Sequence, residues 1–197
     1  MAKRPTPKQT GSRYEYRVWG KHAAARKRLK RLADESTTER IKDCYLLVDD
    51  DSWNAKVRDN TLKIKQLVDE RKGFEQWTSN RHRSADSAPT PFDEIFEQLR
   101  LDRPQRGKKY HIRDAVDGLE AGTDVRAVFV SKTRRRYRIG ELRAEVTDIR
   151  VLDGDRTLHT LSIDGHDLAA LRALRRELGL KASDNVAVHR VLDEVTS

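Results

Sequence analysis

The sequence has little of what disulfide-bonded, secreted or membrane-spanning proteins require. It contains one cysteine in 197 residues, which can form neither an internal disulfide nor a cysteine-based zinc site and so favours a reducing compartment. Its longest apolar run, from Cys44 to Val48, is far shorter than the roughly 20 residues that cross a bilayer. No apolar stretch follows the charged residues at its start, so no secretory signal is visible. We therefore expect a cytoplasmic protein that does not enter a membrane.

Charge is plentiful but unevenly placed. Charged residues make up 37% of the chain, against about 25% in an average soluble domain, and the net charge is +9. Residues 1–31 contain eleven Lys or Arg and a single acid, Glu15, so this segment carries +10 and the rest of the chain carries −1. We expect residues 1–12 to form a flexible basic tail. The alternative is an arm that is attracted to phosphate groups.

Four segments alternate between charged and bulky apolar residues, a pattern that predicts β-strands. They are residues 13–18, 53–58, 61–67 and 125–139, and the second and third are expected to form a hairpin. Each strand gathers its cations on one face. These cations are Arg17, Lys56, Arg58, Lys63, Lys65, Lys132, Arg134 and Arg136. Because like charges side by side destabilise a sheet, an anion or opposing carboxylates should face them.

Three carboxylates lie on three separate predicted strands: Glu15, Glu145 and Asp164. If the sheet closes into a barrel, these carboxylates and the cations point into a shared interior. Buried cations must be paired or must meet an anion, and a polyphosphate satisfies that demand. The carboxylates would then hold a hard divalent ion, since Mg²⁺ takes one or two carboxylates together with phosphate oxygens.

The remaining patterns are helical or irregular. Apolar residues at helical spacing predict a basic helix around residues 25–32, a leucine-rich helix over residues 168–178 and a final helix over residues 188–195. Asp167 precedes the leucine-rich helix and is expected to cap it. Residues 78–91 are polar and aperiodic, which predicts a loop.

Several short motifs follow one another in an order that is specific as a set. They are Tyr-Glu-Tyr-Arg at 14–17, Lys-Val-Arg at 56–58, Leu-Lys-Ile-Lys at 62–65, Lys-Thr-Arg-Arg-Arg-Tyr at 132–137, Arg-Ala-Glu-Val-Thr-Asp at 143–148 and Thr-Leu-Ser-Ile-Asp-Gly at 160–165. This series resembles the CYTH domains, also called triphosphate tunnel metalloenzymes. The resemblance implies an α+β fold, a closed eight-stranded antiparallel β-barrel with flanking helices. It also implies that the barrel binds triphosphate compounds together with Mg²⁺ or Mn²⁺. Known members include inorganic triphosphatases, thiamine triphosphatases, class IV adenylate cyclases and RNA triphosphatases.

The resemblance also suggests how the chain is organised. It extends from Tyr14 to Leu180 and implies a single tunnel domain over residues 13–182. Residues 78–122 are less similar and are expected to be a loop and helical insertion. Residues 183–197 would form a C-terminal helix or tail.

Carried onto this sequence, the resemblance assigns catalysis to Glu15 and Glu145, and metal binding to Glu15, Glu145 and Asp164. It assigns substrate binding to the eight cations named above. Two motifs depart from the family pattern. The opening Glu-x-Glu-x-Lys becomes Arg13-x-Glu15-x-Arg17, and the late Glu-x-Glu becomes Ser162-x-Asp164. Both changes remove a carboxylate from the metal side, while the cationic side is kept. Anion binding is therefore better supported than catalysis.

Three functions remain as hypotheses. The first is a metal-dependent phosphohydrolase acting on inorganic triphosphate or an organic triphosphate. The second is a non-catalytic tunnel that binds triphosphate or polyphosphate. The third and least favoured is a nucleic-acid-binding protein that uses the basic first 31 residues. A purely structural alternative is that Glu15 and Glu145 pair with arginines across strands, and that Arg134, Arg135 and Arg136 form a solvated charge run.

Overall fold

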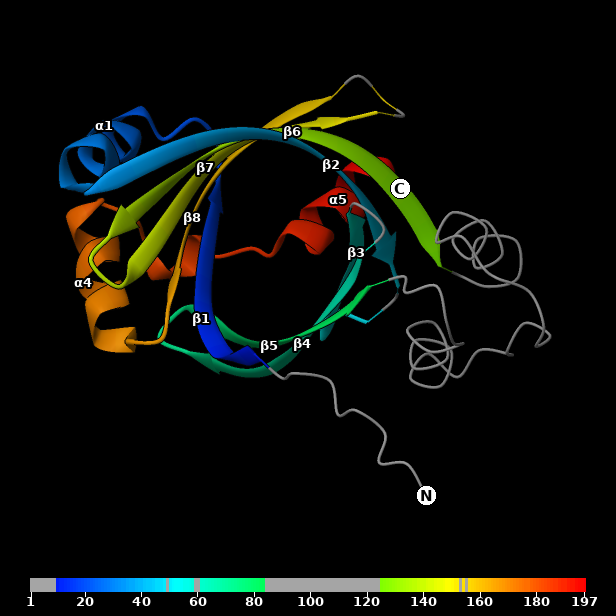
Figure 1. Cartoon of the computed structure of the whole chain (residues 1–197), viewed down its shortest axis with the longest axis horizontal. Coiled ribbons are helices and arrows are strands. Elements are labelled where there is room, and N and C mark those ends of the chain that lie inside the picture. Colours follow the sequence, from blue (N-terminus) through cyan, green and yellow to red (C-terminus); the bar gives the residue numbers. More distant parts are fainter. Residues whose placement is uncertain (1–9, 49, 59–60, 84–124, 153, 155) are drawn as a thin grey trace.

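The computed structural model of this chain describes residues 10–48, 50–58, 61–83, 125–152, 154 and 156–197. Residues 1–9 of the predicted tail and residues 84–122 of the predicted insertion lie outside the described residues. Within the described part, eight strands close into one antiparallel barrel in the order β1-β5-β4-β3-β2-β6-β7-β8 (Figure 1). The predicted fold class, a closed eight-stranded antiparallel barrel with flanking helices, is confirmed.

The described elements follow one another along the chain as β1 (Thr10–Trp19), α1 (Ala23–Leu32), β2 (Glu35–Leu47), β3 (Trp53–Arg58), β4 (Thr61–Arg71), β5 (Phe74–Arg83), β6 (Arg126–Ile139), β7 (Leu142–Val151), β8 (Thr157–Gly165), α4 (Leu168–Glu177), the short 3-10 helix η1 (Ala182–Asp184) and α5 (Val188–Thr196). None of the described helices is long and apolar enough to span a membrane.

Two strands are longer than their sequence pattern predicts. β2 begins at Glu35 and pairs with β6 along its whole length, whereas the apolar run predicted a strand only from Cys44. β5 continues to Arg83, so the predicted loop at 78–91 is wrong for residues 78–83. That part of β5 pairs with β4. Pairing with neighbouring strands outweighs a weak local preference, because strand propensity depends mainly on context.

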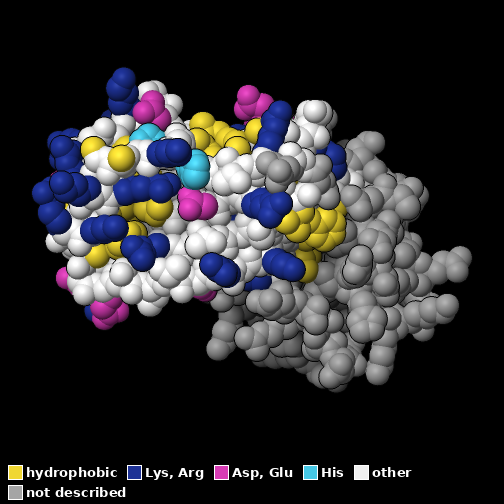
Figure 2. All heavy atoms as spheres, turned by 90° about the horizontal axis from the view of Figure 1, so that it is seen from above, with side chains coloured by type: hydrophobic (Ala, Val, Ile, Leu, Met, Phe, Trp, Pro, Cys, Tyr) yellow, Lys and Arg dark blue, Asp and Glu magenta, His cyan; other side chains and the backbone are white. Residues whose placement is uncertain are grey.

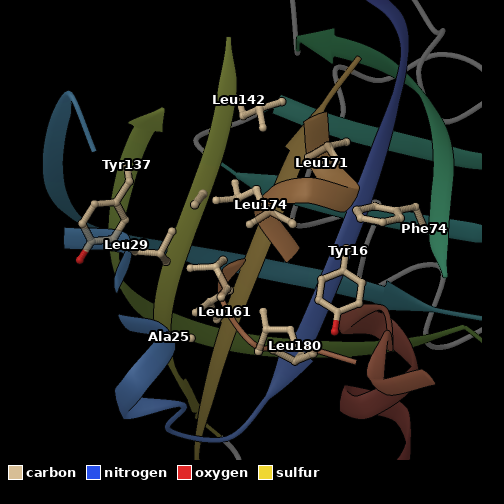
Figure 3. Packing of buried hydrophobic residues seen from close by; sticks show 14 residues of the cluster. Tyr16, Ala25, Leu29, Phe74, Tyr137, Leu142, Leu161, Leu171, Leu174 and Leu180 are labelled. Atoms are coloured by element: carbon tan, nitrogen blue, oxygen red, sulfur yellow. The ribbon is translucent and has the colours of Figure 1, made fainter. Parts of the chain in front are cut away.

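The outer face of the barrel packs against α1 and α4. Leu29 of α1 and Leu171 of α4 are fully buried in the same apolar cluster as Tyr16 of β1 and Leu161 of β8 (Figure 3). The predicted cap of α4 is confirmed, because the side chain of Asp167 accepts hydrogen bonds from the backbone N–H groups of residues 169 and 170 at 2.8 and 3.1 Å. These contacts fix the strands whose inner faces form the site.

The C-terminal helix α5 packs against the inner face of the barrel. Its Val188 and Leu192 are buried against inward-pointing apolar side chains of β2, β6 and β7, among them Tyr45 and Ile149. The segment before α5 is tied to β1, because the backbone N–H of Val186 donates to the carbonyl of Arg17 at 2.9 Å. One part of the interior is therefore apolar and filled, and the polar side chains surround the space that remains.

Candidate functional site

The barrel encloses a central cavity of about 1000 Å³ that receives side chains from all eight strands. Its lining holds ten Lys or Arg residues and five Asp or Glu residues among those described. Every residue predicted to take part in the site lines this cavity. They are Glu15, Arg17, Lys56, Arg58, Lys63, Lys65, Lys132, Arg134, Arg136, Glu145 and Asp164. Their common orientation follows from the alternation of side chains along a strand, while their roles in binding stay predictions.

Three of these cations converge on a buried carboxylate that the sequence analysis missed, Asp43 of β2. Arg58 donates from Nε and Nη2 to its two oxygens at 2.6 and 2.8 Å. Lys56 and Lys132 approach Oδ2 to 3.2 and 3.0 Å. Burial would raise the pKa of Asp43, but the Arg58 hydrogen bonds and the charges of Lys56 and Lys132 outweigh it and hold the pKa far below its usual range. Asp43 is therefore ionised and fixes three cations while offsetting only one positive charge.

The two lysines at Asp43 also lie against the ring of Tyr45. Lys132 Nζ lies 4.4 Å and Lys56 Nζ lies 5.4 Å from the ring centroid, and the Lys132 ammonium also donates to the Tyr45 hydroxyl. Burial lowers the pKa of Lys132 to about 8, although Asp43 opposes the shift. The charge of Lys132 is thus poorly solvated, and an anion that enters the cavity would be attracted more strongly than in bulk water.

A second group of cations is held by Glu39 of β2, which the sequence analysis also missed. Its carboxylate accepts hydrogen bonds from Arg134 and Arg136, and Arg134 Nη1 also lies 3.3 Å from Glu145 Oε2. The Thr147 hydroxyl donates to the other oxygen of Glu145 at 2.7 Å. Burial would raise the pKa of Glu145, but the charges of Arg17 and Arg134 and the Thr147 hydrogen bond lower it to about 2. Glu145 is therefore ionised at neutral pH.

The other two predicted metal ligands are also paired with cations. Both oxygens of Glu15 accept hydrogen bonds from Lys65 of β4. Asp164 lies between two arginines, Arg13 of β1 with Nη1 at 2.9 Å and Arg143 of β7 with Nε at 3.0 Å from the same oxygen. Strands β1 and β7 flank β8 on its two sides, so Asp164 receives one guanidinium from each neighbour.

This arrangement does not fit a metal ion held by the three predicted carboxylates. Among the described residues, no three His, Cys, Asp or Glu side chains gather closely enough to hold a metal ion. Mg²⁺ needs oxygen ligands in near-octahedral geometry and gives up its water reluctantly, and at Asp164 it would also have to displace Arg13 and Arg143. The departures from the family pattern explain the arrangement, since Arg13 pairs with Asp164 and Ser162 stands uncharged opposite Glu145.

A further buried carboxylate, Glu75 of β5, stands directly opposite Glu15 in the strand register. It is held by Arg190 of α5 at 3.0 Å and by the Trp77 indole at 3.2 Å. Burial raises its pKa, with Arg190 opposing the shift. A signal for Asp43 and Glu39 was available in the sequence, because both lie at even spacing upstream of Tyr45. No comparable signal points to Glu75.

Comparisons with known proteins identify the fold but no family. No family model matches the chain, and no curated protein matches it. Similar solved structures include a conserved hypothetical protein from Pyrococcus furiosus, at a TM-score of 0.53 and 16% identity over 90% of this chain and 98% of that chain. They also include the PH1012 protein from Pyrococcus horikoshii, at a TM-score of 0.52 and 16% identity over 88% of this chain and 94% of that chain. Identities this low show a shared fold alone. A Hippeastrum protein with a dominant triphosphatase activity aligns at 12% identity over 87% of this chain and 89% of that chain. Its TM-score of 0.44 supports no conclusion about this chain.

Proposed function

We propose that the central cavity binds the triphosphate group of inorganic triphosphate or of an organic triphosphate. The observation that carries this proposal is the convergence of Lys56, Arg58 and Lys132 on the single buried carboxylate Asp43. Around them, the ten cations of the lining exceed the carboxylates by three when Asp43 and Glu39, which hold cations from outside the lining, are counted with its five carboxylates. Buried cations in excess require an anion, and a compact polyanion supplies several negative charges within the reach of one cavity.

The carboxylates of the cavity hold the cations in place before the ligand arrives. Asp43 orients Lys56, Arg58 and Lys132, and Glu39 orients Arg134 and Arg136. Less side-chain entropy is then lost on binding, which raises affinity. Each charge-assisted hydrogen bond to a phosphate oxygen contributes about 1.5–3 kcal/mol. No resident metal enters the proposal, because the carboxylates that would hold one are already paired with Lys or Arg.

Hydrolysis of the bound triphosphate is the second candidate, and the state of Glu145 favours it. This carboxylate is ionised, lines the cavity and lies beside Arg134 and Thr147. Glu15 is the other predicted catalytic carboxylate, and its pKa is also lowered, because Lys65 outweighs the effect of burial. The surrounding cations would neutralise the charge that develops on the phosphoryl group during transfer.

Two measurements on the full chain separate these candidates. Calorimetric titration with inorganic triphosphate, in EDTA and then in Mg²⁺ or Mn²⁺, measures binding. Phosphate release from inorganic and organic triphosphates under the same conditions measures hydrolysis. We expect tight binding in EDTA. If the protein binds triphosphate but releases no phosphate with either Mg²⁺ or Mn²⁺, the binding function stands and the hydrolysis candidate is rejected. Absence of binding under all three conditions would overturn the proposed function.

A further inference from the structure

The exposed face of α1 is a second concentration of positive charge, outside the barrel. Four of its exposed side chains are basic, Lys27, Arg28, Lys30 and Arg31, and we call them the basic face of α1. No acidic residue occurs between Glu15 and Asp34 in the sequence. Figure 2 shows Lys and Arg side chains gathered over the end of the molecule where Figure 1 places α1.

The fold makes little use of these four charges, beyond the favourable position of Lys30 and Arg31 in the last turn relative to the helix dipole. Helix α1 is held by the burial of Ala25 and Leu29 on its opposite side. Among the described residues, none of the four side chains forms an ion pair, and Arg28 donates only to the backbone carbonyl of Glu177 at 2.8 Å. Lys27 and Arg31 lie four residues apart, a spacing at which like charges destabilise a helix by about 0.2–0.5 kcal/mol. The first turn also lacks an acidic residue to complement the helix dipole.

The basic face is separate from the central cavity. Ala25 and Leu29 of α1 belong to the apolar cluster that contains Leu161 of β8. Neither Leu161 nor Asp148, which lies 3.7 Å from Arg26, lines the cavity. The cations of the cavity lie on the inner face of the barrel. A ligand on α1 therefore neither enters the cavity nor shares its side chains.

We propose that the basic face of α1 binds the phosphate backbone of a nucleic acid. The four cations lie between residues 27 and 31, which is about 6 Å along the helix axis at 1.5 Å per residue. Successive phosphates of a strand lie about 3.4 Å apart along the axis of a duplex, so this turn of the helix matches the spacing of at least two successive phosphates. An anionic membrane suits the helix less well, because a membrane-surface helix inserts an apolar face and α1 buries its apolar face in the protein. Contacts of this kind carry no sequence information.

The test measures fluorescence anisotropy of labelled single-stranded and duplex oligonucleotides that end in a 5′-hydroxyl, so that no triphosphate is present. We expect binding that weakens steeply between roughly 50 and 200 mM salt. The variant Lys27→Glu/Arg31→Glu should lose at least about tenfold in affinity and reduce the salt slope by about two, one for each phosphate contact. Its affinity for inorganic triphosphate should be unchanged, which also shows that the barrel is folded.

The matched control is Arg40→Glu/Lys42→Glu, which makes the same change in net charge at two exposed positions of β2 away from α1. Equal loss of binding in the control would assign the effect to net charge and overturn the proposal. So would absence of oligonucleotide binding by the native chain, or a preference for phosphatidylserine vesicles over oligonucleotides. If the charge-reversed variant is unstable, Lys27→Gln/Arg31→Gln is compared with Arg40→Gln/Lys42→Gln, which again makes the same change in net charge.

Discussion

The cations inside the barrel and those on α1 are chemically alike but differently held. Inside, Lys56, Arg58 and Lys132 share the carboxylate of Asp43, whose side chain is 0% exposed, and burial lowers the pKa of Lys132. Outside, the basic face of α1 is open to water and has no ion pairs among the described residues. Fixed, poorly solvated cations suit a compact anion at close range, because attraction grows as the dielectric falls. Exposed cations suit an extended anion and are screened by salt.

Asp43 holds the cations of the cavity in place, so Asp43→Asn should have the largest effect of the variants considered, a loss of folding stability. Removing one partner of a buried ion network leaves uncompensated charge and costs about 3–5 kcal/mol. We expect the free energy of unfolding in urea to fall by that amount. Inorganic triphosphate should restore part of the loss, because it returns negative charge to the cavity and binds only the folded state.

The control for Asp43→Asn is Asp148→Asn on the outside of the barrel. Asp148 is exposed, with Arg26 3.7 Å away and His159 at 2.7 Å, and surface pairs contribute about 0–1 kcal/mol. Equal stability of the two variants would contradict the assigned role of Asp43.

Adjacent arginines of β6 compare the inner and outer faces directly. Arg134 lines the cavity and contacts Glu39 and Glu145, whereas Arg135 is exposed and donates only to Thr38 among the described residues. Arg134→Ala should weaken the binding of inorganic triphosphate by about 1.5–3 kcal/mol, roughly ten- to a hundredfold by calorimetry. Arg135→Ala should leave it unchanged. A similar loss in both variants would mean that net charge, rather than the cavity, determines affinity.

Much of the fold could be predicted from the sequence because most strands separate two different environments. β3, β4, β6 and β7 face apolar packing on one side and the polar cavity on the other, so charge alternates along them. The first half of β2, Glu35–Lys42, has polar residues on both faces because it lies between the charged interior and solvent. The alternation of polar and apolar residues is lost in this half of β2, so the sequence pattern predicted only the second half of the strand.

The pairs within the site could not be predicted for a related reason. Which carboxylate meets which cation depends on strand order, and only the closed barrel brings β5 beside β1 and β2 beside β6. Glu39 meets Arg134 across 95 residues and Asp43 meets Lys132 across almost as many. Sequence spacing therefore identified the cations, their common face and three of the carboxylates, but it could not show which carboxylate pairs with which cation.

Arg13 offers a test of whether its ion pair with Asp164 weakens the binding of divalent cations on the carboxylate side of the cavity. Arg13→Glu removes one of the two guanidinium groups from Asp164 and places a further carboxylate near Glu15. More ligand charge raises the affinity for divalent cations, so Mn²⁺ binding in the absence of any phosphate should strengthen by about tenfold. Direct calorimetric titration with Mn²⁺ measures this. Equally tight Mn²⁺ binding by the native chain would show that Arg13 does not weaken a metal site.

The smallest expected effect is the pH dependence that Lys132 gives to binding. Its pKa of about 8 in the folded protein means that the empty cavity loses a positive charge between pH 7 and 9. The affinity for inorganic triphosphate should fall by at most about tenfold over that range, because a group with a pKa of about 8 goes from roughly 90% to roughly 10% protonated. Lys132→Met should flatten the profile.

The free energy of unfolding should change in the opposite direction over an overlapping pH range. The pKa of Lys132 is lowered from 10.5 in the unfolded chain to about 8, so between these values the unfolded chain binds more protons and the contribution of Lys132 to stability rises with pH. As the pH rises, Lys132 would therefore stabilise the folded protein more, while the cavity binds inorganic triphosphate less tightly. Urea unfolding at pH 8 and 10, with Lys132→Met as the reference, measures the stability change. A fall in stability that is specific to the native chain would show that Lys132 is not the desolvated ammonium described above.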